Sequence, residues 1–162
     1  MPLDFLLAAA LVAVDQVVKY LVRAGIPLHT AVDFLPGLDL TYVQNTGAAF
    51  SMFAQHTWIL AFISLVMSVV LAVALWKNFF THPLGKVTLT LLLAGAVGNL
   101  IDRVLRGFVV DMFQLLFMNF AVFNVADICV VVGGIAAAAY YLLLADKLEH
   151  KEAPHGTADA DR

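Results

Sequence analysis

The sequence contains one uncharged apolar run, residues 58–76, that is too long for the core of a small soluble domain. Trp58 and Trp76 bound this run, and the helix between them would be about 27 Å long. The hydrocarbon core of a bilayer is roughly 30 Å thick, and tryptophan favours both of its interfaces. Hydrophobic residues make up 62% of the chain and charged residues only 13%. The run therefore predicts a transmembrane helix, with lipid as the solvent for much of the chain.

Three further apolar runs predict transmembrane helices at about residues 5–22, 87–105 and 122–145. The first has no Lys or Arg before it and no small-residue cleavage pattern after it, so we interpret it as a retained span rather than a signal peptide. The predicted fold class is an all-α membrane protein with four transmembrane helices, forming one domain over residues 1–145. Residues 146–162 are polar and contain Pro and Gly, which predicts a disordered cytoplasmic tail.

The basic residues predict the orientation of the four spans. An even number of spans places both termini on one side, together with the loop at 77–86. That side carries Lys77, Lys86, Lys147, Lys151 and Arg162, whereas the opposite side carries Lys19, Arg23, Arg103 and Arg106. The small excess favours termini in the cytoplasm, because cytoplasmic loops are enriched in Lys and Arg. Residues 23–57 and 106–121 are then extracytoplasmic.

The two extracytoplasmic loops have features of folded structure. Residues 38–43 alternate and are β-prone, as are residues 108–110, and the pair Pro36 and Gly37 marks a turn before the first of these segments. We expect a small extracytoplasmic β-sheet built from both loops. Residues 48–54 carry Phe50 and Phe53 three apart, which predicts a short interfacial helix.

Polar residues gather at one end of the predicted bundle. They fall late in the first and third spans, between the third and fourth spans, and early in the fourth. These residues are Asp15, Lys19, Asn99, Asp102, Arg103, Asp111, Asn124 and Asp127. Because successive spans run in opposite directions, all of them lie in one leaflet. Charged groups inside spans are costly and by default mark a functional site.

Helical spacing predicts how some of these residues pair. Asp15 and Lys19 are four apart in the favourable order for an ion pair, and the alternative is an interfacial pair whose lysine snorkels to water. Asn99 shares a helix face with Asp102 and Arg103. We expect Asp102 and Arg103 to form an ion pair that locks the bundle, with substrate binding as a second possibility for Arg103.

Asp111 and Asp127 have no basic residue three or four positions away. Two acids held close together cannot both ionise, so one keeps its proton near neutral pH. The ionised member can take a proton from water while the protonated member donates to a carbonyl oxygen, which is the chemistry of aspartic peptide hydrolysis. The alternative interpretation is two unrelated interfacial acids.

Other chemistries find little support in the sequence. Cys129 is the only cysteine, no histidine lies within a predicted span, and no HExxH pattern occurs, so we expect no catalytic metal. The net charge of −3 gives no electrostatic footprint for nucleic acid.

Ser64 and Ser68 are expected to bond back to their own helix. Small residues four apart, Ala94 with Gly98 and Gly134 with Ala138, predict close helix packing.

Five sequence blocks together resemble the bacterial lipoprotein signal peptidases, or signal peptidase II. The blocks are DQVVK from Asp15, NTGAAF from Asn45, GNLIDR from Gly98, VVD ending at Asp111 and FNVAD ending at Asp127. The resemblance implies an intramembrane aspartic endopeptidase that cleaves diacylglyceryl-modified prolipoproteins just before the lipidated cysteine. It further implies inhibition by the cyclic peptide globomycin and no metal or organic cofactor. We expect the chain to contact membrane phospholipid and to be a monomer.

The resemblance also assigns roles to residues. It implies that Asp111 and Asp127 are the catalytic pair, and that the supporting polar residues are Asp15, Lys19, Asn45, Asn99, Asp102, Arg103 and Asn124. Two other classes of function compete with it. A small proton-coupled transporter or channel would also carry intramembrane acids, but it would need polar groups through both leaflets. A non-catalytic assembly subunit is the other alternative, but it would not explain why the chain carries the five polar blocks.

Overall fold

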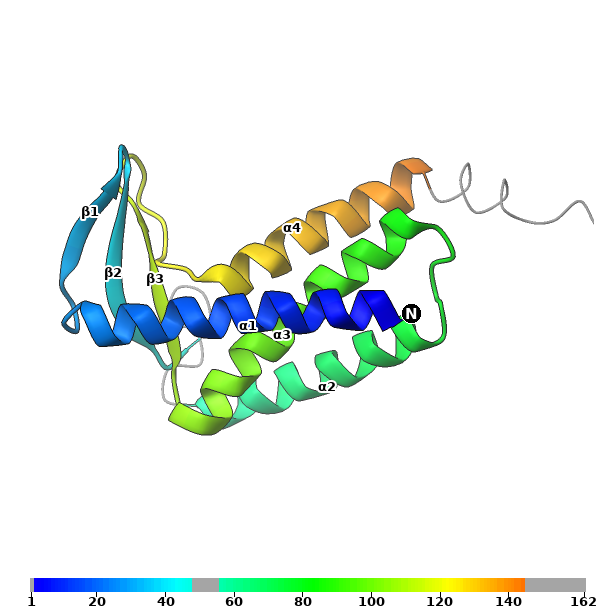
Figure 1. The fold of residues 1–162 in the computed structure, drawn as a ribbon, viewed down its shortest axis with the longest axis horizontal. Coiled ribbons are helices and arrows are strands. Elements are labelled where there is room, and N and C mark those ends of the chain that lie inside the picture. The colour runs from blue at the N-terminus through cyan, green and yellow to red at the C-terminus, as the bar shows by residue number, and fades with distance from the viewer. Residues whose placement is uncertain (1, 48–55, 145–162) are drawn as a thin grey trace, which may run out of the picture.

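A computed structural model of the chain describes residues 2–47 and 56–144 and consists of four long helices and a small sheet (Figure 1). The helices are α1 (Pro2–Gly25), α2 (Thr57–Trp76), α3 (Pro83–Arg106) and α4 (Val125–Ala139), and α4 continues as a π-helical segment, Tyr140–Leu144. The strands are β1 (Ala31–Leu35), β2 (Leu38–Asn45) and β3 (Val109–Leu115). All four helices are long and apolar enough to cross a membrane, as predicted.

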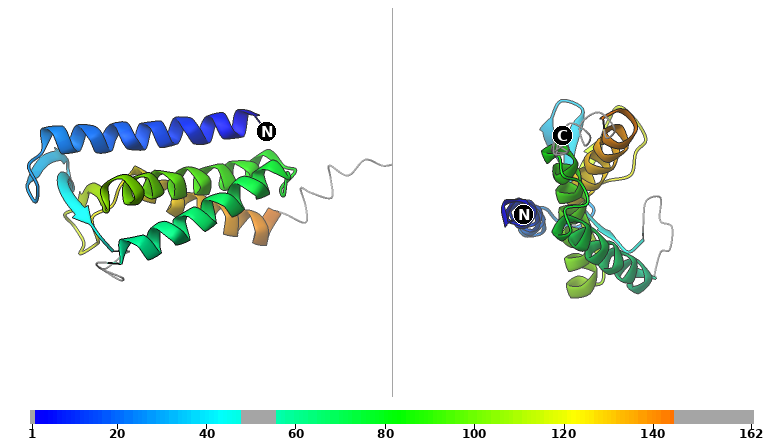
Figure 2. Two further views of the ribbon diagram at one scale, coloured as in Figure 1. Left: turned by 90° about the horizontal axis from the view of Figure 1, so that it is seen from below. Right: turned by 90° about the vertical axis from the view of Figure 1, so that its right-hand side faces the viewer.

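The helices lie side by side along one axis, and the sheet closes one end of the bundle (Figures 1 and 2). Helix α3 occupies the centre and contacts α1, α2 and α4. The N-terminal end of α1 and the last turn of α4 lie at the opposite end from the sheet, so the up-down topology inferred from the spans is confirmed. Loops far apart in sequence therefore meet at the sheet end, together with the end of α3 and the start of α4.

Local sequence explains where the helices begin and end. The His82 ring accepts a hydrogen bond from the Leu84 backbone, and Pro83 fills the first turn of α3, so this helix begins four residues earlier than residue 87. It ends at Gly107, whose φ of 78° is a left-handed conformation that glycine adopts without strain. Helix α4 begins at Val125 rather than at 122, because Asn124 caps it.

The sheet is antiparallel, with the strand order β1-β2-β3. Pro36 and Gly37 form the expected turn, and Gly37 has a φ of 84°. Strand β1 was not expected, and β3 extends to Leu115 rather than ending near 110. In the pairing of β2 with β3, Val43 lies opposite Asp111 and Asn45 lies opposite Val109. This register brings Asn45 and Asp111 to neighbouring positions of adjacent strands.

Close helix packing depends on glycines of α3 and α4. A Cβ atom at Gly98 would lie 2.8 Å from Asp15 Oδ2 and 3.0 Å from Ala126 Cβ, so three helices meet at this point. The expected packing face that includes Gly134 is wrong, because a Cβ there would meet nothing within 4 Å. Its neighbour Gly133 instead faces Leu91 and Leu92 of α3. The predicted interfacial helix at 48–54 and the predicted tail at 146–162 lie outside the described residues.

Candidate active site

Asp111 lies on β3 with its side chain turned into the protein, where the residue is only 2% exposed. Its Oδ2 accepts a hydrogen bond of 2.9 Å from the Asn45 side-chain amide, and its Oδ1 accepts one of 2.6 Å from the Asn124 amide. The carbonyl oxygen of the Asn45 side chain accepts from the Gly47 backbone, so the amide group is oriented with its nitrogen toward Asp111. Both carboxyl oxygens of Asp111 therefore receive neutral donors.

Asp127 lies in the first turn of α4 and takes part in its capping box. Its backbone N–H donates to Asn124 Oδ1 at 2.9 Å, and its Oδ2 accepts from the Asn124 backbone N–H at 3.1 Å. Its other oxygen, Oδ1, accepts a 2.7 Å hydrogen bond from the Asn99 side-chain amide. The start of a helix favours negative charge, so this position suits an ionised carboxylate.

Asn124 connects the two acids. While its Oδ1 caps α4 at Asp127, its Nδ2 donates to Asp111 Oδ1 and, at 3.2 Å, to Asn99 Oδ1. Asn124 is itself fully buried, so water does not compete for these contacts. The structure thus places Asp111 and Asp127 in one hydrogen-bonded network, together with the predicted supporting residues Asn45, Asn99 and Asn124.

A second network of charged side chains lies behind the first. Lys19 Nζ contacts Asp15 Oδ2 at 2.9 Å and Asp102 Oδ2 at 3.1 Å, and Asp102 also pairs with Arg106. The side chain of Lys19 is 0% exposed, so the snorkelling alternative for Asp15 and Lys19 is wrong. Asp102 additionally accepts from the Val110 backbone N–H, which ties α3 to the start of β3.

The predicted ion pair between Asp102 and Arg103 does not form. Neighbouring residues on a helix point about 100° apart, so Asp102 faces α1 while Arg103 faces α2 and the cavity. Arg103 donates to Ser64 Oγ at 3.3 Å, and its Nε is buried with no hydrogen-bond partner among the described residues. Ser68 bonds back to the Ser64 carbonyl as expected, but the Ser64 hydroxyl instead accepts from Arg103.

Both acids line a cavity of about 460 Å³ whose walls differ in chemistry. One wall is polar and is formed by Asn45, Arg103, Asp111 and Asp127. The other comes from the end of β3, the β3–α4 connection and the outer face of α4, and consists mainly of Leu115, Met118, Phe120, Val122, Phe123, Ile128, Val130, Val131 and Val132. Such a cavity can hold a group that is polar on one side and lipid-like on the other.

Electrostatics favour a proton on Asp111. Burial, reinforced by the negative charge of Asp127, raises the pKa of Asp111 from 3.8 to about 7, even though the amides of Asn45 and Asn124 oppose the shift. Asp111 therefore keeps its proton at pH values where an exposed carboxyl has lost it. A protonated acid beside an ionised one can donate and accept protons in the same reaction.

Two other kinds of group are relevant to the site. Over residues 2–47 and 56–144, no three His, Cys, Asp or Glu side chains gather closely enough to hold a metal ion. Sequence reasoning missed Gln16, whose amide contacts Asp15 and the Gly98 carbonyl, and Arg106, the partner of Asp102. Arg106 lies four residues after Asp102, so its spacing was a usable signal, whereas nothing marked Gln16.

Comparisons with known proteins agree with this architecture. A family model described as Signal peptidase (SPase) II matches residues 7–143. The chain is 45% identical to the lipoprotein signal peptidase of Enterococcus faecalis (strain ATCC 700802 / V583) over 94% of each chain. It is also 45% identical to that of Streptococcus pneumoniae (strain ATCC BAA-255 / R6), over 76% of this chain and 81% of the relative. A bacterial membrane enzyme whose structure was solved by the in meso method superposes with a TM-score of 0.81 at 30% identity, covering 95% of this chain and 94% of that one.

The fold and the cavity define a multi-pass bacterial membrane enzyme. Within that class, the chain belongs to the signal peptidase II family. The predictions of fold class, of a peptidase activity and of a signal peptidase II function are confirmed. Nothing in the comparisons favours the transporter or channel alternative.

Proposed function

We propose that this chain cleaves the signal peptide from diacylglyceryl-modified prolipoproteins just before the lipidated cysteine, with Asp111 and Asp127 as the catalytic pair. The observation that carries the proposal is the bridge made by Asn124, which joins both carboxyl groups in one cavity. Aspartic peptide hydrolysis needs two such groups that share one proton.

In the proposed reaction, the ionised carboxyl removes a proton from a water molecule as the water oxygen attacks the scissile carbonyl carbon. The protonated carboxyl donates its proton to the carbonyl oxygen, which yields a neutral tetrahedral intermediate. Collapse of the intermediate breaks the C–N bond: the first carboxyl returns its proton to the leaving amine nitrogen, and one hydroxyl of the intermediate returns its proton to the second carboxyl, which regenerates the pair. The raised pKa of Asp111 supports a protonated partner near neutral pH.

The two walls of the cavity support a lipid-linked substrate. Ile128 and Val131 on α4 are apolar and line the cavity beside the acids, where acyl chains can extend toward lipid. Arg103 and Asn45 line the polar wall, where donors can hold peptide carbonyl oxygens or glyceryl ester oxygens. All of the named side chains come from one chain, which is compatible with a monomer.

Asp15 and Asp102 support the reaction through packing in this proposal. Asp15 accepts from the Ala126 backbone N–H at 2.9 Å, which fixes the start of α4 against α1. Asp102 joins α3 to α1 and β3. Both contacts position the helices that carry Asn99 and Asp127, although neither Asp15 nor Asp102 lines the cavity.

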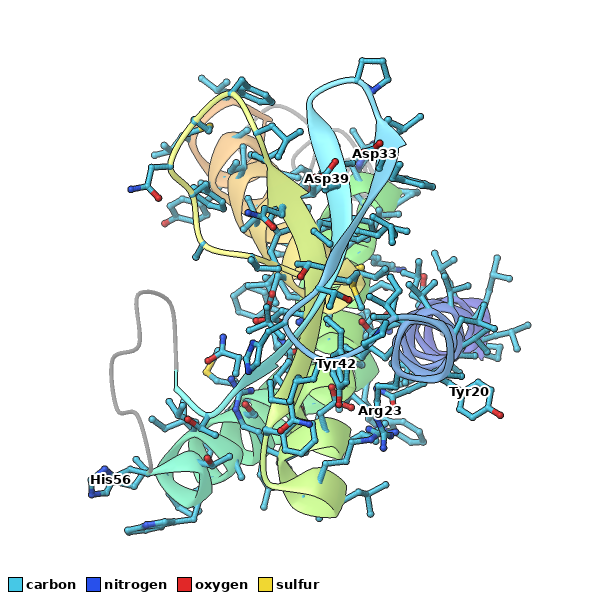
Figure 3. All side chains as sticks on the ribbon, turned by 90° about the vertical axis from the view of Figure 1, so that its left-hand side faces the viewer. Tyr20, Arg23, Asp33, Asp39, Tyr42 and His56 are labelled. Carbon is cyan, nitrogen blue, oxygen red and sulfur yellow. The ribbon has the colours of Figure 1, made fainter. Side chains whose placement is uncertain are left out.

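We also propose that both termini are cytoplasmic and that the site opens near the extracytoplasmic face. Among the basic residues at the sheet end, Lys19 is buried, whereas Arg23 is exposed near the end of α1 (Figure 3). Lys77 is exposed at the other end, in the loop before α3. Fewer exposed cations therefore lie at the sheet end than the sequence count implied, which strengthens the positive-inside argument.

Cysteine labelling tests the orientation. In a Cys129→Ala background, an impermeant maleimide added to intact spheroplasts is expected to label an Asp33→Cys variant, since Asp33 lies on the β1–β2 hairpin (Figure 3). It is expected to label a Lys77→Cys variant only after the membrane is opened. The reverse pattern would overturn the proposed orientation.

A cleavage assay tests the proposed activity. The purified protein in detergent is incubated with one prolipoprotein prepared with and without the diacylglyceryl group, and the products are identified by mass spectrometry. We expect cleavage of the lipidated form only, a new N-terminus at the modified cysteine, and inhibition by globomycin. Equal cleavage of both forms, or cleavage elsewhere, would contradict the proposed substrate.

A further inference from the structure

We infer that Lys19 is a positioning residue for this reaction: through Asn99, it makes Asp127 the ionised acid and leaves the proton on Asp111. The inference rests on the proposed catalytic pair and extends it to a side chain that does not line the cavity. It also assigns the two acids to different roles, with Asp127 as the general base and Asp111 as the general acid.

The orientation of the Asn99 amide carries the argument. Lys19 Nζ contacts Asn99 Oδ1 at 3.1 Å, and its other two contacts are Asp15 and Asp102. An ammonium group has three protons and no acceptor, so these three contacts use its full capacity and only the amide oxygen can face it. The Asn99 nitrogen is therefore turned toward Asp127, to which it donates at 2.7 Å, and the Asn124 amide supports this orientation by donating to the same Asn99 oxygen at 3.2 Å.

The charged cluster around Lys19 has no net charge. Asp15 and Asp102 are balanced by Lys19 and Arg106, and these four side chains contact one another directly. A neutral cluster exerts only a weak long-range field on the cavity. The direct attraction of Lys19 acts on both carboxyl groups. Lys19 therefore distinguishes Asp127 from Asp111 by fixing and polarising the Asn99 amide, which donates to Asp127 in a short charge-assisted chain of hydrogen bonds.

The two acids differ in what stabilises a negative charge. Asp127 accepts from the polarised Asn99 amide and from a backbone N–H at the start of α4. Asp111 lies on a strand and accepts from the side-chain amides of Asn45 and Asn124. Arg103 on α3 lines the cavity with both acids, and its attraction is stronger for Asp127 than for Asp111, so it favours the same assignment. The environment thus favours the anion at Asp127, in agreement with a pKa of about 7 for Asp111.

The pH profile of kcat tests the inference, because a purely structural lysine would change the height of the profile and leave its limbs in place. Lys19→Met alone would strand two buried acids, so the informative variant is Asp15→Asn combined with Lys19→Met, which keeps the cluster neutral. Its acidic limb is expected to move to higher pH by about one unit, because the base is protonated more readily without the fixed amide. Asp15→Asn alone keeps Lys19 against Asn99, and its acidic limb is expected to stay in place or to move slightly to lower pH.

A second variant keeps the test independent of how well the double variant folds. Asn99→Ala leaves the contacts of Lys19 with Asp15 and Asp102 intact and removes only the amide, so its acidic limb is expected to move in the same direction. Adding the Asp15 and Lys19 changes to Asn99→Ala is expected to produce no further movement. An unmoved acidic limb in folded Asn99→Ala would overturn the inference even if Asp111→Asn and Asp127→Asn are inactive. Activity in those two variants would instead overturn the proposed catalytic pair.

Discussion

Gly95 of α3 lies directly against the backbone of Ala126 in α4: a Cβ atom on Gly95 would be 2.4 Å from the Ala126 carbonyl oxygen. No side chain fits between the two helices at this level. Asn99 follows one turn after Gly95, and Asp127 follows Ala126, so the same close approach allows the 2.7 Å hydrogen bond between them. The packing of small residues and the geometry of the site are therefore one feature of the fold.

Gly95→Ala is expected to destabilise the protein by about 1–3 kcal/mol, since the new methyl group would clash with the Ala126 backbone, which cannot move unless the two helices separate. Separation of α3 from α4 would also lengthen the contact between Asn99 and Asp127, so cleavage is expected to fall at least about ten-fold. Thermal unfolding in detergent and initial cleavage rates measure the two effects. Gly134→Ala is the matched control, because a Cβ there meets nothing within 4 Å. Equal behaviour of the two variants would contradict this account of the packing.

The raised pKa of Asp111 predicts how the stability of the protein depends on pH. Its pKa is raised from 3.8 to about 7, chiefly by burial, so the folded protein holds a proton that the unfolded chain has lost within this range. Stability is therefore expected to fall as pH rises from about 4 to 7. Asp111→Asn cannot ionise and should flatten the dependence of Tm on pH, whereas Asp33→Asn, at an exposed acid, should leave its slope unchanged. Parallel curves for wild type and Asp111→Asn would exclude the raised pKa.

Ser64 and Ser68 provide a matched pair on α2 for testing the role of Arg103. The Ser64 hydroxyl accepts from Arg103, whereas the Ser68 hydroxyl bonds back to its own helix. Loss of the Arg103 contact is expected to cost about 1 kcal/mol of transition-state stabilisation, or roughly five-fold in kcat/KM. Ser64→Ala should show this loss and Ser68→Ala should not, when both are compared on the lipidated substrate. A similar change in both would mean that the contact does not matter for cleavage.

The gross architecture could be predicted from the sequence because hydropathy and topology determine it. Four apolar runs define the spans, and their alternating direction brings Asp15, Asn99, Asp111 and Asp127 to one end. Strand β1 was missed for a physical reason: all five of its residues are exposed, so it shows no alternation between a buried and an exposed face. Only pairing with β2 defines it as a strand.

Partner choice inside the bundle could not be predicted from spacing alone. Whether Lys19 snorkels or is buried depends on Asp102 and Asn99, which lie about eighty residues later in the chain. The neighbours Asp102 and Arg103 point to different helices, and this depends on which sides of α3 are covered by α1 and α2. The predicted packing face of α4 was wrong by one residue for the same reason: spacing indicated Gly134, whereas Gly133 is the glycine that packs against α3.

The most direct test of the central claim is cleavage of the lipidated prolipoprotein by Asp111→Asn and Asp127→Asn, measured in single-turnover experiments. Asp33→Asn serves as the control, and gel filtration and globomycin binding check that each variant is folded. Both site variants are predicted to lose at least about a hundred-fold in rate, as expected when a general acid or base is removed, while the control cleaves normally. Cleavage at close to the wild-type rate by either folded site variant would contradict the assignment of Asp111 and Asp127 as the catalytic pair.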